Sequence, residues 1–131
     1  MSSLVRTIQT RDAAFHICIS PDNQHAAVST CNYQYNVFSL KDGTLVDQGY
    51  HSTYNVITSS LAFSHDGVYL ICGRSTGDVW VSAFAPILRL PPNIERAHER
   101  RVNQIVVSED NRFVVSASDD GTARVFSMET G

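Results

Sequence analysis

A repeat with a period of 44 residues runs through this chain without a gap and constrains the fold more than any single residue does. Its anchor is a Ser-x-Asp turn, whose aspartates Asp22, Asp66 and Asp110 lie 44 residues apart. An apolar triplet precedes each turn, and two further apolar runs follow it. The 131 residues are therefore predicted to hold three copies of one structural unit, over about 4–43, 44–87 and 88–131.

The apolar runs inside each unit have the length and composition of strands. They are four to six residues long, rich in Val, Ile, Phe, Tyr and Ser, and divided by turn pairs such as Asp42-Gly43 and Asp120-Gly121. A repeat of about 40–45 residues with four short strands is typical of a propeller blade. We therefore predict an all-β fold of three four-stranded antiparallel blades, with the inner strands covered on both faces.

The third unit carries the most specific pattern of the three. The residues of that pattern are His98, Val102, Ile105, Ser108, Asp110, Ser116, Ser118, Asp120-Gly121-Thr122, Val125 and Phe126. At these spacings the unit resembles the WD40-repeat family, with Phe126-Ser127 in the place of the family's usual Trp-Asp pair. In the first two units, Thr10 and Tyr54 stand at the position of His98, so the resemblance covers essentially the whole chain but is specific only in its last third.

The resemblance implies a structural role for a group that would otherwise suggest a hydrolase. In this family a His, a Ser or Thr and an Asp form a buried hydrogen-bond network, which here corresponds to His98, Ser116, Ser118 and Asp120. A nucleophilic triad needs an accessible serine beside an oxyanion hole. No Gly-x-Ser-x-Gly motif occurs in the sequence. We expect no catalytic activity and no cofactor.

Three blades are fewer than the roughly four to eight that close a propeller. An open arc would leave apolar sides of its two end blades exposed, because stacked repeats bury their faces only against neighbours. Two explanations stay open. Two copies form a ring of six blades by exchanging an outer strand over residues 4–8, or the remaining blades belong to a longer chain or to another polypeptide.

Composition favours a cytoplasmic or nuclear protein. The chain is 43% apolar and has no run near the length that spans a bilayer, and Arg6, Gln9 and Asp12 interrupt any signal-peptide core. Its 3 cysteines, Cys18, Cys31 and Cys72, lack Cys-x-x-Cys spacing, which favours reduced thiols and no metal site. A net charge of −3 makes a nucleic-acid partner unlikely.

These observations favour a non-catalytic scaffold or complex subunit that binds protein partners through loops at one end of the blades. The arginines favour an acidic or phosphorylated partner, because a guanidinium binds carboxylate or phosphate with two hydrogen bonds. Two alternatives stay open: a nucleic-acid-binding propeller subunit, and a purely architectural ring or coat component. The predicted partner-binding residues are Tyr33, Tyr54, Arg74, Arg100, Arg101, Asn103 and Asp119.

Overall fold

The computed structural model describes residues 3–4, 6–10, 12–31, 33–50, 56–84, 94 and 96–128. Across these residues the chain forms three antiparallel sheets and no helix, which confirms the predicted all-β class. The first sheet has the order β1 (Ala14–Ile19), β2 (His25–Thr30), β3 (Tyr33–Ser39) and β4 (Leu45–Tyr50). β4 follows the start of the second 44-residue unit but pairs with β3, so sequence repeat and sheet are offset by one strand.

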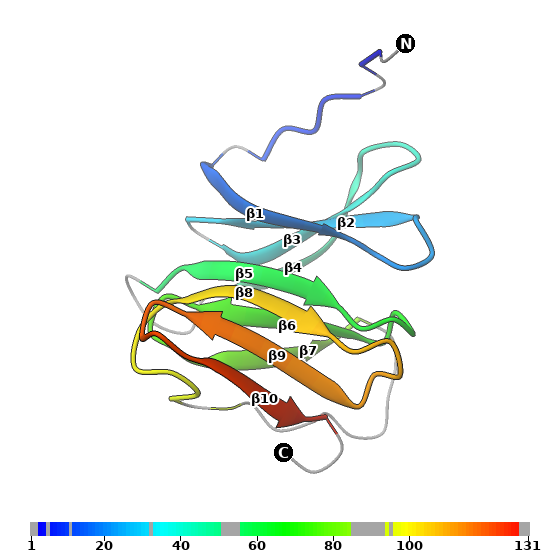
Figure 1. Cartoon of the computed structure of the whole chain (residues 1–131). Coiled ribbons are helices and arrows are strands. Elements are labelled where there is room, and N and C mark those ends of the chain that lie inside the picture. Colours follow the sequence, from blue (N-terminus) through cyan, green and yellow to red (C-terminus); the bar gives the residue numbers. More distant parts are fainter. Residues whose placement is uncertain are drawn as a thin grey trace.

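The second and third sheets have three strands each within the described residues. β5 (Thr58–Phe63), β6 (Tyr69–Arg74) and β7 (Val79–Ala83) form the second sheet, and β8 (Val102–Val107), β9 (Phe113–Ser118) and β10 (Ala123–Ser127) form the third. Beside β7, Ile94 takes the place of a fourth strand through an antiparallel bridge to Val79. Figure 1 shows the three sheets stacked in chain order, with β5 in contact with β1 on one side and β8 on the other.

The Ser-x-Asp motif that sets the period is one turn built three times. Ser20 Oγ donates to Asp22 Oδ1 (2.5 Å) and accepts from the N–H of His25 (3.0 Å), while the N–H of Gln24 donates to Asp22 Oδ1 (2.9 Å). Asn23 has a φ of 61°, in the left-handed region that Asn and Gly tolerate best. In the other copies the Ser-to-Asp bond measures 2.6 Å at Ser64 and 2.7 Å at Ser108, and Gly67 and Asn111 take the positive φ.

Two apolar clusters hold the sheets together, one on each side of the middle sheet. Leu70 of β6 packs in a cluster with Val37 of the first sheet, while its neighbour Ile71 packs with Ile105 of the third. Successive residues of a strand point to opposite faces, so β6 serves both interfaces. The middle sheet is therefore buried on both faces.

The end sheets differ from the prediction that all inner strands are covered on both faces. Ile17 and Ile19 of β1 are 62% and 56% exposed, and Val106 of β8 is 52% exposed. Each of these sheets has only one neighbouring sheet in the structure, so alternate residues of its inner strand face outward. The exposed apolar sides expected for an open arc are present.

The segment predicted to form an outer strand over residues 4–8 does not do so. Leu4 and residues 6–8 lie outside every strand. The guanidinium of Arg6 donates instead to the backbone carbonyls of Lys41 (2.7 Å) and Asp42 (3.2 Å). This segment is thus held at the β3–β4 turn by side-chain hydrogen bonds rather than by strand pairing.

His16 connects the first two sheets and makes their contact sensitive to pH. The N–H of Leu61 donates to Nδ1 of His16 (3.2 Å), which must be unprotonated to accept. Burial lowers the pKa of His16 below its ordinary value of 6.5. The folded chain therefore favours neutral His16. Its contribution to stability is complete above pH 6.5 and is lost as the pH falls from 6.5 towards the folded-state pKa.

The variant His16→Asn keeps an acceptor near the Nδ1 position but cannot titrate. We expect the free energy of unfolding of this variant, measured by urea titration, to fall less than that of the wild type between pH 7.5 and pH 5. Because the other histidines are common to both proteins, the difference isolates His16. Parallel pH profiles would contradict the assignment.

Candidate functional site

The loop before β8 carries His98, and the β6–β7 turn fixes its position. The N–H of His98 donates to the carbonyl of Gly77 (3.0 Å), and Gly77 has a φ of 96°. A Cβ added at Gly77 would lie 2.0 Å from the carbonyl oxygen of His98. Only glycine fits this close approach, so the turn of the second sheet determines where the histidine of the third sheet lies.

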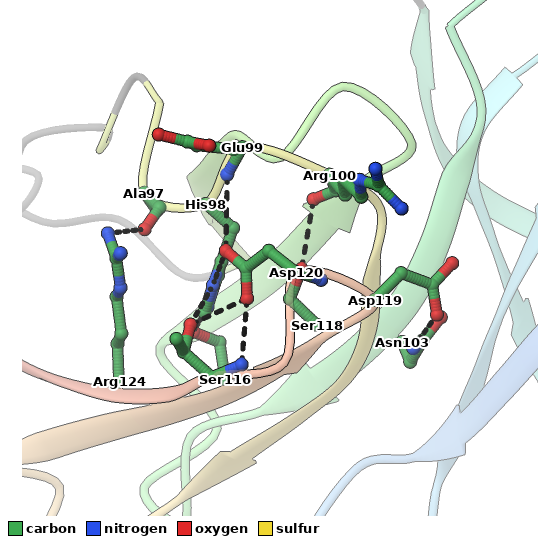
Figure 2. A network of polar contacts seen from close by, with 11 residues as sticks. Ala97, His98, Glu99, Arg100, Asn103, Ser116, Ser118, Asp119, Asp120 and Arg124 are labelled. Carbon is green, nitrogen blue, oxygen red and sulfur yellow. Dashed lines mark hydrogen bonds and ion pairs between the residues drawn. The ribbon is translucent and has the colours of Figure 1, made fainter.

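A hydrogen-bond network joins this loop to β9 and to the β9–β10 turn (Figure 2). His98 Nδ1 lies 2.9 Å from Asp120 Oδ2, and Nε2 lies 2.6 Å from Ser116 Oγ. Because a carboxylate can only accept, Nδ1 carries a proton, and Nε2 shares the second hydrogen bond of the ring with the serine hydroxyl. The backbone N–H of Glu99 also donates to Asp120 Oδ2 (3.2 Å).

Thr122 is the member of the network that the sequence analysis missed. Its hydroxyl donates to Asp120 Oδ1 (2.6 Å) and lies 3.1 Å from His98 Nδ1, and its N–H donates to the same carboxylate oxygen (2.9 Å). The Asp-Gly-Thr sequence itself could have indicated this role. In Asp42-Gly43-Thr44, the hydroxyl and the N–H of Thr44 likewise donate to one carboxylate oxygen of Asp42, at 2.7 and 3.0 Å. An Asp-Gly-Thr turn thus holds its own carboxylate in place before any tertiary contact forms.

Ser118, predicted in the network, makes no direct bond to His98. Its Oγ donates to the carbonyl of Arg100 (3.1 Å) and accepts from the N–H of Asp120 (3.1 Å). The structure thus brings His98, Ser116 and Asp120 together, whereas Ser118 ties the loop before β8 to the β9–β10 turn through backbone groups.

The environment of Asp120 favours its charged form strongly. The hydrogen bond from Thr122 lowers the pKa of this carboxyl most, and the bond from His98 and the two backbone N–H groups lower it further. Its pKa is therefore far below the ordinary value of 3.8. A permanent carboxylate orients the His98 ring and fixes its tautomer.

The network cannot act on a substrate in this structure. His98 is 1% exposed and Ser116 is 0% exposed, so no acyl group can reach the serine oxygen. Phe126 packs against the apolar cluster between the second and third sheets, at the position where the family pattern has a Trp indole N–H. The four side chains His98, Ser116, Asp120 and Thr122 satisfy one another without that donor.

Exposed polar side chains lie directly beside this buried network, and we call Arg100, Arg101, Asn103 and Asp119 the β8 rim. All four are exposed. Asn103 Nδ2 donates to Asp119 Oδ1 (2.6 Å), and the N–H of Asp119 donates to the carbonyl of Arg101 (3.1 Å). The rim therefore joins the start of β8 to the β9–β10 turn.

A bulge in β8 turns the side chain of Asn103 towards Asp119. The register of β8 against β9 shifts between Val102 and Gln104, which leaves Asn103 as the extra residue. The same shift occurs between Ala14 and His16 and between Thr58 and Ser60. Each inner strand thus has one bulge at the same point of the repeat, and in the third sheet it turns an amide side chain towards the rim.

The remaining predicted partner-binding residues are placed differently. Arg74 is 2% exposed, its guanidinium lies 4.5 Å from the ring centre of Trp80, and its Nε and Nη2 atoms have no hydrogen-bond partner within the described residues. Burial lowers the pKa of Arg74, and the charge of Asp78 partly offsets this effect. Arg74 is thus not part of an exposed surface. Tyr33 begins β3, but its side chain, like all of Tyr54, lies outside the described residues.

Cys18 lies in β1, Cys72 is buried in β6 and Cys31 is exposed, and none of the three forms a disulfide within the described residues. Burial raises the pKa of Cys18 to about 12, so this thiol stays protonated at neutral pH. Where the structure is described, no group of three or more His, Cys, Asp or Glu side chains is placed to hold a metal ion.

Among the described residues, no helix is long and apolar enough to cross a membrane.

Comparison with known proteins finds a family match over the third sheet and one partial relative. Residues 91–127 match the family described as "WD domain, G-beta repeat", and this range contains β8, β9, β10 and the His98 network. A 71-residue segment is 35% identical to Protein ROOT INITIATION DEFECTIVE 3 of Arabidopsis thaliana. That alignment covers 53% of this chain and 15% of the length of the Arabidopsis protein.

Substitution of Ser116 or Ser118 distinguishes the contribution of the buried network from that of its exposed surroundings. Ser116→Ala leaves Nε2 of His98 buried without a hydrogen-bond partner, which we expect to cost about 1–3 kcal/mol of unfolding free energy. Ser118→Ala is the matched control, because Ser118 is only half-buried and water can replace its bonds. Urea titration of both variants at pH 7 measures the difference. Equal losses would contradict the network as drawn.

The lowered pKa of Asp120 predicts how the free energy of unfolding changes at acidic pH. A lowered folded-state pKa gives stability that is present above pH 3.8 and is lost as the pH falls below that value towards the folded-state pKa. We expect Asp120→Asn to be less stable than the wild type at pH 7, and the gap to narrow below pH 3.8. Unfolding curves at pH 7, 4 and 3 test this. A gap that does not change with pH would show that the charge of Asp120 is not the stabilising feature.

Proposed function

We propose that this chain, whose residues 91–127 match the WD40 repeat, is a non-catalytic scaffold that binds acidic or phosphorylated protein segments on the β8 rim. WD40 repeats generally mediate protein interactions. Each of the four rim residues presents a charged or amide side chain to solvent.

The observation that carries the proposal is a contrast between two sets of polar side chains. One set is buried and bonds within itself, and the other is exposed beside it. The Ser116, His98 and Asp120 side chains bond to one another in the interior. Arg100 and Arg101, on the same loop as His98, are exposed and have no ion-pair partner within the described residues. The serine, histidine and aspartate side chains therefore have a structural role, whereas the two arginine side chains are available to bind a partner.

Two hydrogen bonds beside the network give the rim a fixed shape. The carbonyls of Arg100 and Arg101 accept from Ser118 Oγ and from the N–H of Asp119, so the backbone on both sides of these arginines is held. A held backbone lowers the conformational entropy that ordering a loop on binding would cost. Binding residues presented by a rigid scaffold are a general property of such loops.

The chemistry of the rim selects the partner class. Arg100 and Arg101 are neighbours in the sequence and both are exposed. Guanidinium groups favour phosphate or carboxylate, because each can donate two parallel hydrogen bonds. The carboxylate of Asp119, which is the acidic residue of the rim, already accepts a hydrogen bond from Asn103. An acidic or phosphorylated segment is therefore a better match than a basic one.

A peptide array that contains acidic, phosphoserine and neutral scrambled sequences tests the proposal. We expect the wild type to bind acidic or phosphorylated spots, and Arg101→Glu to weaken this binding by at least about tenfold. Arg112→Glu makes the same change of charge on the β8–β9 turn, at the other end of β8, and should bind like the wild type. Equal loss in both variants would indicate a non-specific charge effect, and no binding by the wild type would overturn the proposal.

A further inference from the structure

The contacts between neighbouring sheets follow one rule, which the apolar triplets of the inner strands show most clearly. The middle residue of the first triplet, Cys18, packs against the cluster that contains Leu61 and Phe63, the two flanking residues of the second triplet. The middle residue of the second triplet, Ala62, packs against the cluster that contains Ile105 and Val107. At both internal junctions, a middle residue of one sheet therefore faces the flanking residues of the next.

Each end of the stack carries one unmatched half of this junction. On the first sheet the flanking residues Ile17 and Ile19 are 62% and 56% exposed. On the third sheet the middle residue Val106 is 52% exposed. We call the exposed side of β1 with Phe15, Ile17 and Ile19 the flank face, and the exposed side of the third sheet with Val106, Phe113, Val115 and Val125 the middle face.

The middle face repeats a surface that is buried within the same chain. Phe113, Val115 and Val125 lie 44 residues after Tyr69, Ile71 and Val81. Those three residues pack in the cluster between the second and third sheets. The third sheet thus presents to solvent the same kind of surface that the second sheet uses to bind its neighbour, and the first sheet presents the surface that receives it.

We infer that two copies of this chain associate head to tail, with Val106 of each copy seated between Ile17 and Ile19 of the other, to close a ring of six sheets. The flank face and the middle face are complementary to each other rather than each to itself. The contact is therefore heterologous, and a heterologous contact gives a closed assembly only if its rotation closes. This inference concerns the sheet faces and does not depend on the proposed function of the β8 rim.

Two features favour a second copy of this chain over other occupants. Two copies supply six sheets, within the range of about four to eight that closes a propeller, whereas three copies supply too many. The exposed parts of the named side chains amount to roughly 400 Å² on each face. The two junctions of such a ring would bury roughly 1,600 Å² in total, which is the size of a standard stable interface.

Light scattering coupled to size exclusion tests the assembly over a range of protein concentrations. We expect a mass of twice the 14.5 kDa of one chain. Val106→Asp places a charge on the middle face and should give the mass of one chain, as should Val125→Asp at a second position on that face. Val46→Asp is the matched control, because Val46 is similarly exposed, at 50%, but lies on β4 outside both faces. It should keep the wild-type mass.

A mixing experiment tests the head-to-tail geometry. Ile17→Lys alone should give one-chain mass, because both junctions of its ring would contain a buried lysine. An equal mixture of Ile17→Lys and Val106→Asp should restore the two-chain mass, since one junction pairs the new charges and the other is wild type. Circular dichroism of each variant alone shows whether its strands are intact.

Three results would overturn the inference. A wild-type mass of one chain at all concentrations would show that the faces do not bind each other, and other sheets would then be the occupants. Growth beyond two copies would show that the rotation does not close. A mixture of folded variants that stays at one-chain mass would show that the contact is not between the flank and middle faces. Peptide binding at the rim, measured separately, is unaffected by any of these results.

Discussion

The structure depends on one constraint, which is that the apolar face of each sheet is buried only by the sheet beside it. The second sheet shows the satisfied state, because adjacent residues Leu70 and Ile71 of β6 pack into two different clusters. The first and third sheets each have one covered face, and their other faces expose Ile17, Ile19 and Val106. The exposed apolar faces of the first and third sheets are therefore a direct consequence of how this fold buries apolar surface.

The fold also depends on the polar network of the third sheet, which lies between the interior and the proposed binding rim. The backbone N–H of His98 is bonded to the carbonyl of Gly77, and its ring nitrogens are bonded to Ser116 and Asp120. A buried histidine without partners would destabilise the chain, because burial of unpaired polar groups is unfavourable. A neighbouring bond from Ser118 Oγ to the carbonyl of Arg100 fixes the loop that carries Arg100 and Arg101 at the surface.

Part of the site could be predicted from the sequence, and part could not. The Ser-x-Asp turns were predictable because their hydrogen bonds join residues two to five positions apart. The place of Arg74 was not, because it depends on stacking over Trp80 and on burial by surrounding strands. Thr122 was within reach of sequence reasoning, since Asp42-Gly43-Thr44 repeats its local motif. The bulge that turns Asn103 towards the rim is visible only in the register of β8 against β9.

The sequence by itself determined the 44-residue period, the three consecutive strands that open each sheet and the turns between them, since these arise from contacts between residues close together in the chain. The tertiary structure alone decided which apolar residues are covered, which arginines are exposed and which serine meets His98. The physical reason is that strand alternation gives each sheet two faces, whereas burial depends on whether a neighbouring sheet lies against each face. That neighbour is supplied by residues far away in the sequence, as when Ser59 of β5 donates to the carbonyl of Val102 in β8.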